Sequence, residues 1–233
     1  EKAMTEHGAP LFVFPMPGIM SVAVGVLVYA GTRDEEWPKD AGLAHACEHM
    51  VFQGNSRLGS SQAISEEIEA DGGGLNAFTA PEMTFFHRFV PASAFETAVR
   101  SLASQMESPL FRPEDITKEM QNVIAEIKRM QDNPAQLCHT VFEGVVYGDH
   151  PLGKDTLGST ESVLGFCRQD FVRWKERLYH PDNYVFLVVG DVTAKDACAV
   201  INRAWFGERA GRRNERVPVM DIRQKTKVSV IER

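Results

Sequence analysis

The 233-residue sequence predicts an α+β fold, organised as one large domain or two small ones. Segments with strand and helix patterns are mixed, without the regular βαβ rhythm that builds a parallel sheet. A hydrophobic content of 43% suits a globular core. The apolar run at residues 21–30 is shorter than the roughly 18 residues that a membrane span needs. We therefore interpret this run as a buried strand and expect no membrane span.

Strands are predicted where short apolar runs end at turn residues. The first two lie within residues 11–31, on either side of the turn Pro15-Met16-Pro17-Gly18, because proline and glycine favour turns. The other strands are expected at residues 75–79, 83–90, 184–189 and 225–232.

Helices are predicted where apolar residues recur at helical spacing. The clearest case is 113–130, because Pro113 suits the first helical turn and acidic residues follow it at once. The apolar stripe of this helix consists of Ile116, Met120, Ile124 and Ile127. Further helices are expected at residues 41–52, 62–70, 92–106, 134–145, 169–178 and 194–205.

The last part of the chain, residues 208–233, is expected to be a linker followed by the short terminal strand. Its first half is basic, but acidic residues and a glycine interrupt the arginines, so we interpret it as solvated. The arginines are Arg209, Arg212, Arg213 and Arg216. The folded domain is then expected to comprise residues 1–207.

The charge and the cysteine content indicate which partners and which cellular compartment to expect. The net charge of -7 argues against general nucleic-acid binding. The 4 cysteines lack paired spacing, which favours free thiols in a reducing compartment. No signal peptide is evident, so we expect a cytoplasmic protein. A periplasmic or organellar location would apply if a leader had been removed.

The strongest chemical motif is His45-Ala46-Cys47-Glu48-His49, an H-x-x-E-H pattern. On a helix, residues three and four apart share a face, so His45, Glu48 and His49 point to one side. The opposite side is apolar, and Cys47 there is expected to be a small buried core residue. Two imidazoles can bind one Zn²⁺, while the carboxylate takes the proton from a metal-bound water.

A catalytic zinc ion needs a third protein ligand, and the helix at 113–130 offers two candidates. Glu119 and Glu126 are seven residues apart and share a face, with about 10 Å between them along the axis. Both cannot easily bind the same ion, so one is expected to be a ligand and the other to support the site or the substrate. Spacing alone leaves open which is which, and both could equally be solvent-facing charges. His87 is interpreted as a strand residue and not as a ligand.

With these residues the chain resembles the pitrilysin/insulinase family of zinc metallopeptidases, which includes bacterial relatives of the mitochondrial processing peptidase. In that family a glutamate ligand follows H-x-x-E-H by somewhat over seventy residues, and Glu126 lies 77 positions after His49. A second glutamate, seven residues earlier and needed for activity, matches Glu119. Further family-like segments are residues 42–45, 50–54, 75–79, 150–153, 179–183 and 189–192.

The resemblance implies a role for each site residue. His45, His49 and Glu126 would hold one zinc ion per chain. Glu48 would be the general base, with Glu119 also required for catalysis. The resemblance also places Asn76 and Ala77 on an edge strand beside the metal, where an extended peptide substrate adds as a further strand.

The resemblance also implies the architecture: a single antiparallel sheet packed by helices on one side, forming half of a clamshell peptidase. Residues 1–207 would be the zinc-bearing half, and residues 208–233 would lead to a second half. We therefore expect a partner in the form of a homologous half, a homologous subunit or a second copy of this chain.

The function expected from the sequence is that of a zinc-dependent endopeptidase acting on extended or unstructured peptides. Two alternatives remain: a non-catalytic half that scaffolds a peptidase complex, and a subunit with purely structural zinc. The intact motif argues against the first alternative. Structural zinc sites are usually closed by four protein ligands and rich in cysteine, which argues against the second.

Overall fold

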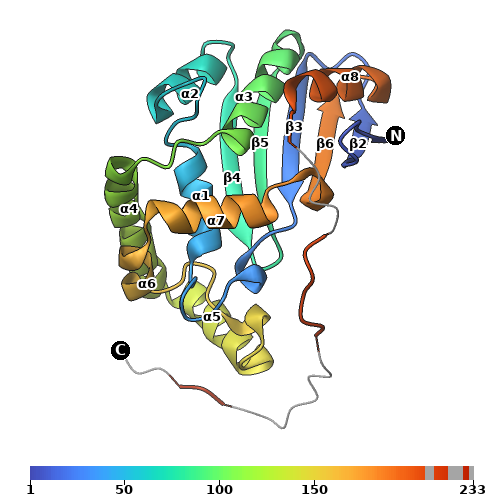
Figure 1. Cartoon of the computed structure of the whole chain (residues 1–233). Coiled ribbons are helices and arrows are strands. Elements are labelled where there is room, and N and C mark those ends of the chain that lie inside the picture. The colour runs from blue at the N-terminus through green and yellow to red at the C-terminus, as the bar shows by residue number, and fades with distance from the viewer. Residues whose placement is uncertain (208–212, 220–227, 231–233) are drawn as a thin grey trace.

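The computed structural model describes residues 1–207, 213–219 and 228–230. In this part of the chain, helices cover one face of a six-stranded sheet (Figure 1). The strands are β1 (Lys2–Met4), β2 (Pro10–Pro15), β3 (Ser21–Val28), β4 (Gly74–Ala80), β5 (Met83–Pro91) and β6 (Tyr184–Gly190). The α-helices are α1 (Leu43–Val51), α2 (Ser61–Glu69), α3 (Phe95–Glu107), α4 (Pro113–Asp132), α5 (Pro134–Tyr147), α6 (Thr160–Gly165), α7 (Arg168–Leu178) and α8 (Ala194–Ala204).

The strand order is β1-β2-β6-β3-β5-β4, so β4 forms one edge of the sheet. All neighbouring strands are antiparallel except β2 and β6, which are parallel. The expected α+β class, with helices on one side of a single sheet, is confirmed. The sheet was expected to be antiparallel, and the β2–β6 pair is the one departure among the described strands. The last of the described strands, β6, inserts between the first two long strands, β2 and β3, so these two do not pair.

The two faces of the sheet differ because the side chains of a strand alternate in direction. Along β3, Val22, Val24, Val26 and Val28 are buried under the helices, with aromatic residues of β5 and β6 beside them. The opposite face of the sheet keeps apolar side chains exposed, including Phe89, which is 58% exposed. Among the described helices, none is long and apolar enough to cross a lipid bilayer.

The predicted helices and strands up to residue 207 are all present, with small differences at their ends. The short elements β1 and α6 were not predicted, because three and six residues are too few for a periodic pattern. Of the expected strand at 225–232, residues 228–230 have no regular structure and the rest lies outside the described residues.

The interpretation of the basic stretch as solvated is wrong for Arg216. Its side chain is only 5% exposed and pairs with Asp34 at 2.7 Å. The guanidinium also lies 3.5 Å from the centroid of the Tyr29 ring. Residues 213–219 have neither helix nor strand, yet this contact fixes them against the folded domain. Arg209 and Arg212 lie outside the described residues.

Candidate functional site

Helix α1 carries both motif histidines and is oriented by its apolar side. Leu43, Cys47 and Met50 are fully buried in the core, so the other side of the helix, with the histidines, faces away from that core. Cys47 is the small core residue that was expected, and burial raises the pKa of its thiol to about 12. A thiol with such a pKa stays protonated and unreactive at neutral pH.

The N-terminus of α1 is fixed by a carboxylate that lies outside the helix. Gly42 precedes the helix with φ of +86°, and a Cβ at this position would come within 2.4 Å of the Leu157 carbonyl oxygen. Glu35 accepts hydrogen bonds from the backbone N–H groups of Gly42 (3.1 Å) and Ala44 (2.9 Å). This side chain therefore provides the cap that glycine lacks. Burial raises the pKa of Glu35, while the two backbone hydrogen bonds act in the opposite direction.

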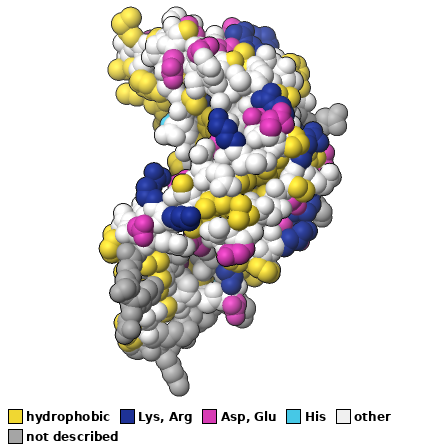
Figure 2. Space-filling model, turned by 90° about the vertical axis from the view of Figure 1, so that its left-hand side faces the viewer, with side chains coloured by type: hydrophobic (Ala, Val, Ile, Leu, Met, Phe, Trp, Pro, Cys, Tyr) yellow, Lys and Arg dark blue, Asp and Glu magenta, His cyan; other side chains and the backbone are white. Residues whose placement is uncertain are grey.

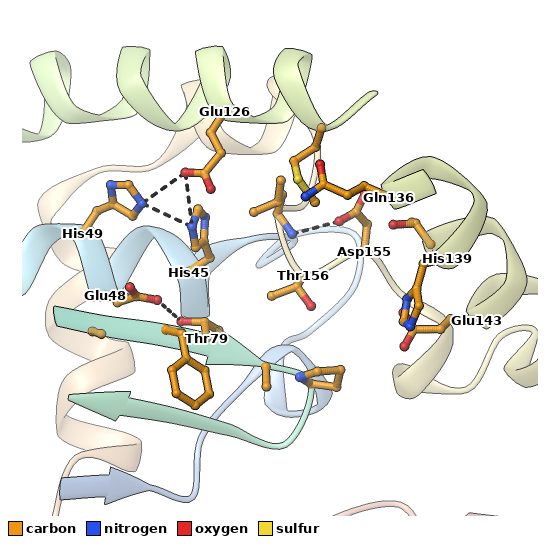
Figure 3. A pocket seen from close by; sticks show the side chains of 17 residues that line it. His45, Glu48, His49, Thr79, Glu126, Gln136, His139, Glu143, Asp155 and Thr156 are labelled. Atoms are coloured by element: carbon orange, nitrogen blue, oxygen red, sulfur yellow. Dashed lines mark hydrogen bonds and ion pairs between the residues drawn. The ribbon is translucent and has the colours of Figure 1, made fainter. Parts of the chain in front are cut away.

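Three side chains from α1 and α4 converge at the centre of the site (Figure 3). The Nε2 atoms of His45 and His49 are 3.2 Å apart. Glu126 Oε2 lies 3.6 Å from His45 Nε2 and 3.5 Å from His49 Nε2. One atom from each residue thus points to a shared centre, and the three could hold a metal ion there.

Glu119 lies one step further from this centre, behind His49. Its Oε1 atom is 2.8 Å from His49 Nδ1, and its Oε2 atom accepts a hydrogen bond of 3.0 Å from Asn122. A carboxylate beside Nδ1 favours a proton on that nitrogen, which leaves Nε2 directed at the metal centre. The structure therefore separates the two glutamates: Glu126 reaches the centre, and Glu119 orients one of its imidazoles.

The two histidines differ in their protonation in the metal-free chain. Burial, and next the charge of His49, lower the pKa of His45 to about 4. Burial also acts to lower the pKa of His49, but its hydrogen bonds with Glu119 and Glu126 prevail and raise it to about 9. His45 is thus neutral near pH 7, while His49 must release a proton before its Nε2 can bind a metal.

Glu48 lies on the same face of α1, half-buried between the histidines and the sheet. Its Oε2 atom accepts a hydrogen bond of 2.5 Å from the hydroxyl of Thr79 on β4. Burial raises the pKa of Glu48, while the Thr79 hydrogen bond and the nearby His49 act in the opposite direction. Glu48 is not one of the three residues whose ligand atoms converge, but it lines the same cavity as they do.

Cavities open on both sides of Glu48 and His49. The larger has a volume of about 490 Å³ and extends from the metal-site residues to α5, where His139 and Glu143 form the far wall (Figure 3). The smaller, about 280 Å³, includes Phe52 and Leu75. The space-filling view shows the outline of the molecule hollowed at mid-height on the left of the picture (Figure 2).

The edge strand β4 lies along both cavities. Ala77 lines the two of them, and Asn76 lines the smaller one. The backbone N–H of Ala77 donates to Oδ1 of Asn76 at 2.8 Å. His87 lies opposite Asn76 on β5 and stacks on Phe85, so it is the strand residue that was expected and stands apart from the converging side chains.

Sequence reasoning missed two contributors to the site. Glu35 gave no signal, because it acts on a helix end from 8 residues before the first helical position. Thr79 was noticed only as part of a family-like segment, and its hydrogen bond to Glu48 depends on the packing of α1 against β4.

Comparisons with known proteins show what the chain is similar to. The family model described as Insulinase (Peptidase family M16) matches residues 16–160. An uncharacterized zinc protease of Rickettsia bellii is 30% identical over 217 residues, covering 93% of this chain and 52% of that protein. One from Mycobacterium tuberculosis (strain H37Rv) is 34% identical over 197 residues, covering 84% of this chain and 44% of that protein. The chain thus spans about half the length of these curated relatives.

Solved structures share the fold. A protease from Helicobacter pylori has a TM-score of 0.84 at 22% identity, over 91% of this chain and 51% of that one. The peptidase M16 inactive domain from Pseudomonas fluorescens has a TM-score of 0.81 at 18% identity, over 93% and 53%. Pitrilysin has a TM-score of 0.80 at 23% identity, over 94% of this chain but 24% of its own.

Proposed function

Because the chain belongs to the insulinase family of peptidases (family M16), we propose that it is the zinc-bearing part of an endopeptidase that hydrolyses extended peptides. One observation carries the proposal. Two imidazole nitrogens and one carboxylate oxygen meet within 3.6 Å of one another, with Glu48 beside them. The relatives named zinc proteases support the same metal.

The three donor atoms fit a zinc ion. With zinc–ligand bonds of about 2.0–2.2 Å, two ligands of a tetrahedral site lie roughly 3.3–3.5 Å apart. The three distances between His45 Nε2, His49 Nε2 and Glu126 Oε2 are 3.2, 3.5 and 3.6 Å. Three protein ligands leave one position open, as in catalytic zinc sites. When bound here, zinc would supply Lewis-acid chemistry and lower the pKa of a coordinated water.

The protein itself supplies the proton transfer. Glu48 is the carboxylate next to the ligands, so we assign it as the general base that takes a proton from the attacking water. It then passes that proton to the nitrogen of the leaving amine, which is the usual pair of roles for a carboxylate in peptide hydrolysis. Glu119 acts indirectly: it holds the His49 ring so that Nε2 points to the ligand position.

The edge strand β4 offers a place for an extended peptide. A peptide that added beside Asn76 and Ala77 would be held by backbone hydrogen bonds, while its side chains entered the cavities on either side of Glu48. To accept the peptide, the Ala77 N–H must first leave the Asn76 side chain. This mode favours substrates without stable structure over folded proteins.

We further propose that activity requires a second part, on the same or another chain. The chain spans about half of the relatives and about a quarter of pitrilysin. The outer face of the sheet also exposes apolar side chains such as Phe14 and Phe89, which are 55% and 58% exposed. Exposed apolar patches of this kind are typical of surfaces that contact another domain or subunit.

A second candidate is a non-catalytic half that only scaffolds a complex. The Pseudomonas fluorescens structure, an M16 inactive domain, has the same fold as this chain, so the fold alone does not distinguish the two candidates. The complete set of His45, Glu48, His49 and Glu126 favours the catalytic half. A subunit with purely structural zinc would have no use for Glu48.

The test is purification with metal analysis, followed by cleavage of a mixed peptide pool with and without a second subunit. We expect one zinc ion per chain and cleavage that needs Glu48. The Glu48→Gln variant should keep its zinc and lose turnover by at least about a hundredfold. Zinc at full occupancy with no cleavage under any pairing would instead support the scaffold.

A further inference from the structure

The Thr79 hydroxyl lies between the edge strand and Glu48. Thr79 is on β4, and its Oγ1 atom is 2.5 Å from Glu48 Oε2 on α1 (Figure 3). A charge-assisted hydrogen bond of this length is among the stronger ones in proteins. It joins the proposed general base to the strand that borders both cavities.

The direction of this hydrogen bond follows from the hydroxyl behind it. Thr84, opposite Thr79 on β5, is fully buried and donates its own hydrogen to the carbonyl of Ala30 at 2.9 Å. The two threonine hydroxyls are 3.5 Å apart, which is a weak contact at best. Since a hydroxyl has a single hydrogen, Thr79 gives it to Glu48, the nearer acceptor.

We infer that Thr79 is a positioning residue for Glu48: its hydroxyl occupies Oε2, so that the other carboxylate oxygen, Oε1, takes the proton during hydrolysis. This inference rests on the proposed function for its kinetic consequence. The hydrogen bond also favours the charged carboxylate, which opposes the effect of burial on the pKa of Glu48.

The position of Thr79 in the strand adds a second consequence. Residues two apart in a strand project from the same face, so Thr79 and Ala77 share a face of β4. The larger cavity includes both residues together with Glu48. A peptide that added to β4 at Ala77 would therefore bind to the same strand whose Thr79 holds Glu48. A shift of this strand would misplace both the substrate and the Glu48 carboxylate.

Three single variants test the inference. Thr79→Val removes the hydroxyl but keeps the shape and the β-branched side chain, and Thr79→Ser keeps the hydroxyl. Thr84→Val is the matched control, because it removes the opposite hydroxyl, which donates to the Ala30 carbonyl and not to Glu48. Each variant is compared with the unaltered chain for zinc content, for kcat and KM on the cleaved peptide, and for the side-chain carboxyl ¹³C resonance of Glu48. Glu48→Gln identifies that resonance.

We expect Thr79→Val to lower kcat by about 10- to 100-fold, the loss typical of a hydrogen bond to a charged group, with KM and zinc content nearly unchanged. The Glu48 carboxyl resonance should shift in the same variant. Thr79→Ser should restore both values, and Thr84→Val should alter neither.

A Glu48 resonance that does not move in Thr79→Val would overturn the inference, and so would an equal response in Thr84→Val. Loss of zinc in Thr79→Val would also overturn it, because the residue would then support the metal site in general. The resonance is measured without substrate. An unaltered chain that cleaves nothing would therefore count against the proposed function, while the resonance still decides on Thr79.

Discussion

Two consecutive helices, α4 and α5, each bring a glutamate close to a histidine that lines the larger cavity, but only the pair with the α4 glutamate is largely buried. Glu119 on α4 lies 2.8 Å from His49, and the two side chains are 11% and 23% exposed. Glu143 on α5 lies 3.6 Å from His139, whose side chain is 74% exposed. The difference between the pairs follows from the helices, since α4 buries an apolar stripe and α5 has no fully buried residue.

A glutamate–histidine pair therefore behaves differently when it is buried and when it is exposed. A buried carboxylate fixes the orientation and the proton of its histidine, because few other partners compete for either. An exposed pair is solvated and contributes about 0–1 kcal/mol to the free energy of unfolding. The wall formed by α4 is therefore preorganised for chemistry, whereas the α5 wall bounds the cavity without fixing its own side chains.

The largest expected effect is on metal binding and comes from the carboxylate that reaches the centre. Glu126→Ala removes one of three protein ligands, so zinc affinity should fall by about a thousandfold or more. Glu143→Ala removes a carboxylate from the other wall of the same cavity and should leave the affinity unchanged. Competition with a chromophoric chelator measures both. Equal affinities for the two variants would show that Glu126 is not a ligand.

The next effect concerns the stability of the metal-free chain. Ile116 on α4 is 5% exposed, so Ile116→Ala should lower the free energy of unfolding by about 2–4 kcal/mol. Phe142 on α5 is 63% exposed, and Phe142→Ala should change it by no more than about 0.5 kcal/mol. Urea denaturation provides the test. A large loss for Phe142→Ala would mean that α5 is as firmly packed as α4.

Much of this site could be predicted from the sequence because its first part is local. The spacing of His45, Glu48 and His49 places them on one helical face whatever the rest of the chain does. Spacing also placed Glu119 and Glu126 on one face of α4. It did not reveal which of them meets the histidines, since that depends on how α4 sits against α1, a matter of packing.

The residues that sequence reasoning misjudged are those whose partners lie far along the chain. Composition indicated that Arg216 is solvated, but Asp34 and Tyr29, far upstream, provide a buried partner and a ring. Gly42 gave no sign of a helix cap, because the cap comes from Glu35 across a loop. Local patterns predict local geometry, and such distant pairings follow only from the fold.

The smallest expected effect tests the comparison of the two pairs directly. Glu119→Gln keeps the size of the side chain but removes the charge that holds the proton on His49 Nδ1. The His49 ring is then less firmly oriented, and zinc affinity should fall by about 10- to 100-fold, as is usual when a partner of a metal-bound histidine is lost.

Glu143→Gln makes the same change beside His139 and should leave zinc affinity unaltered, because His139 is not among the converging residues. Zinc titrations of the two variants, run side by side, measure the difference. If the two glutamines had the same effect, burial would not be what separates α4 from α5. If only Glu119→Gln weakens zinc binding, Glu119 acts through the orientation of His49, since the oxygens of Glu119 are not among the converging ligand atoms.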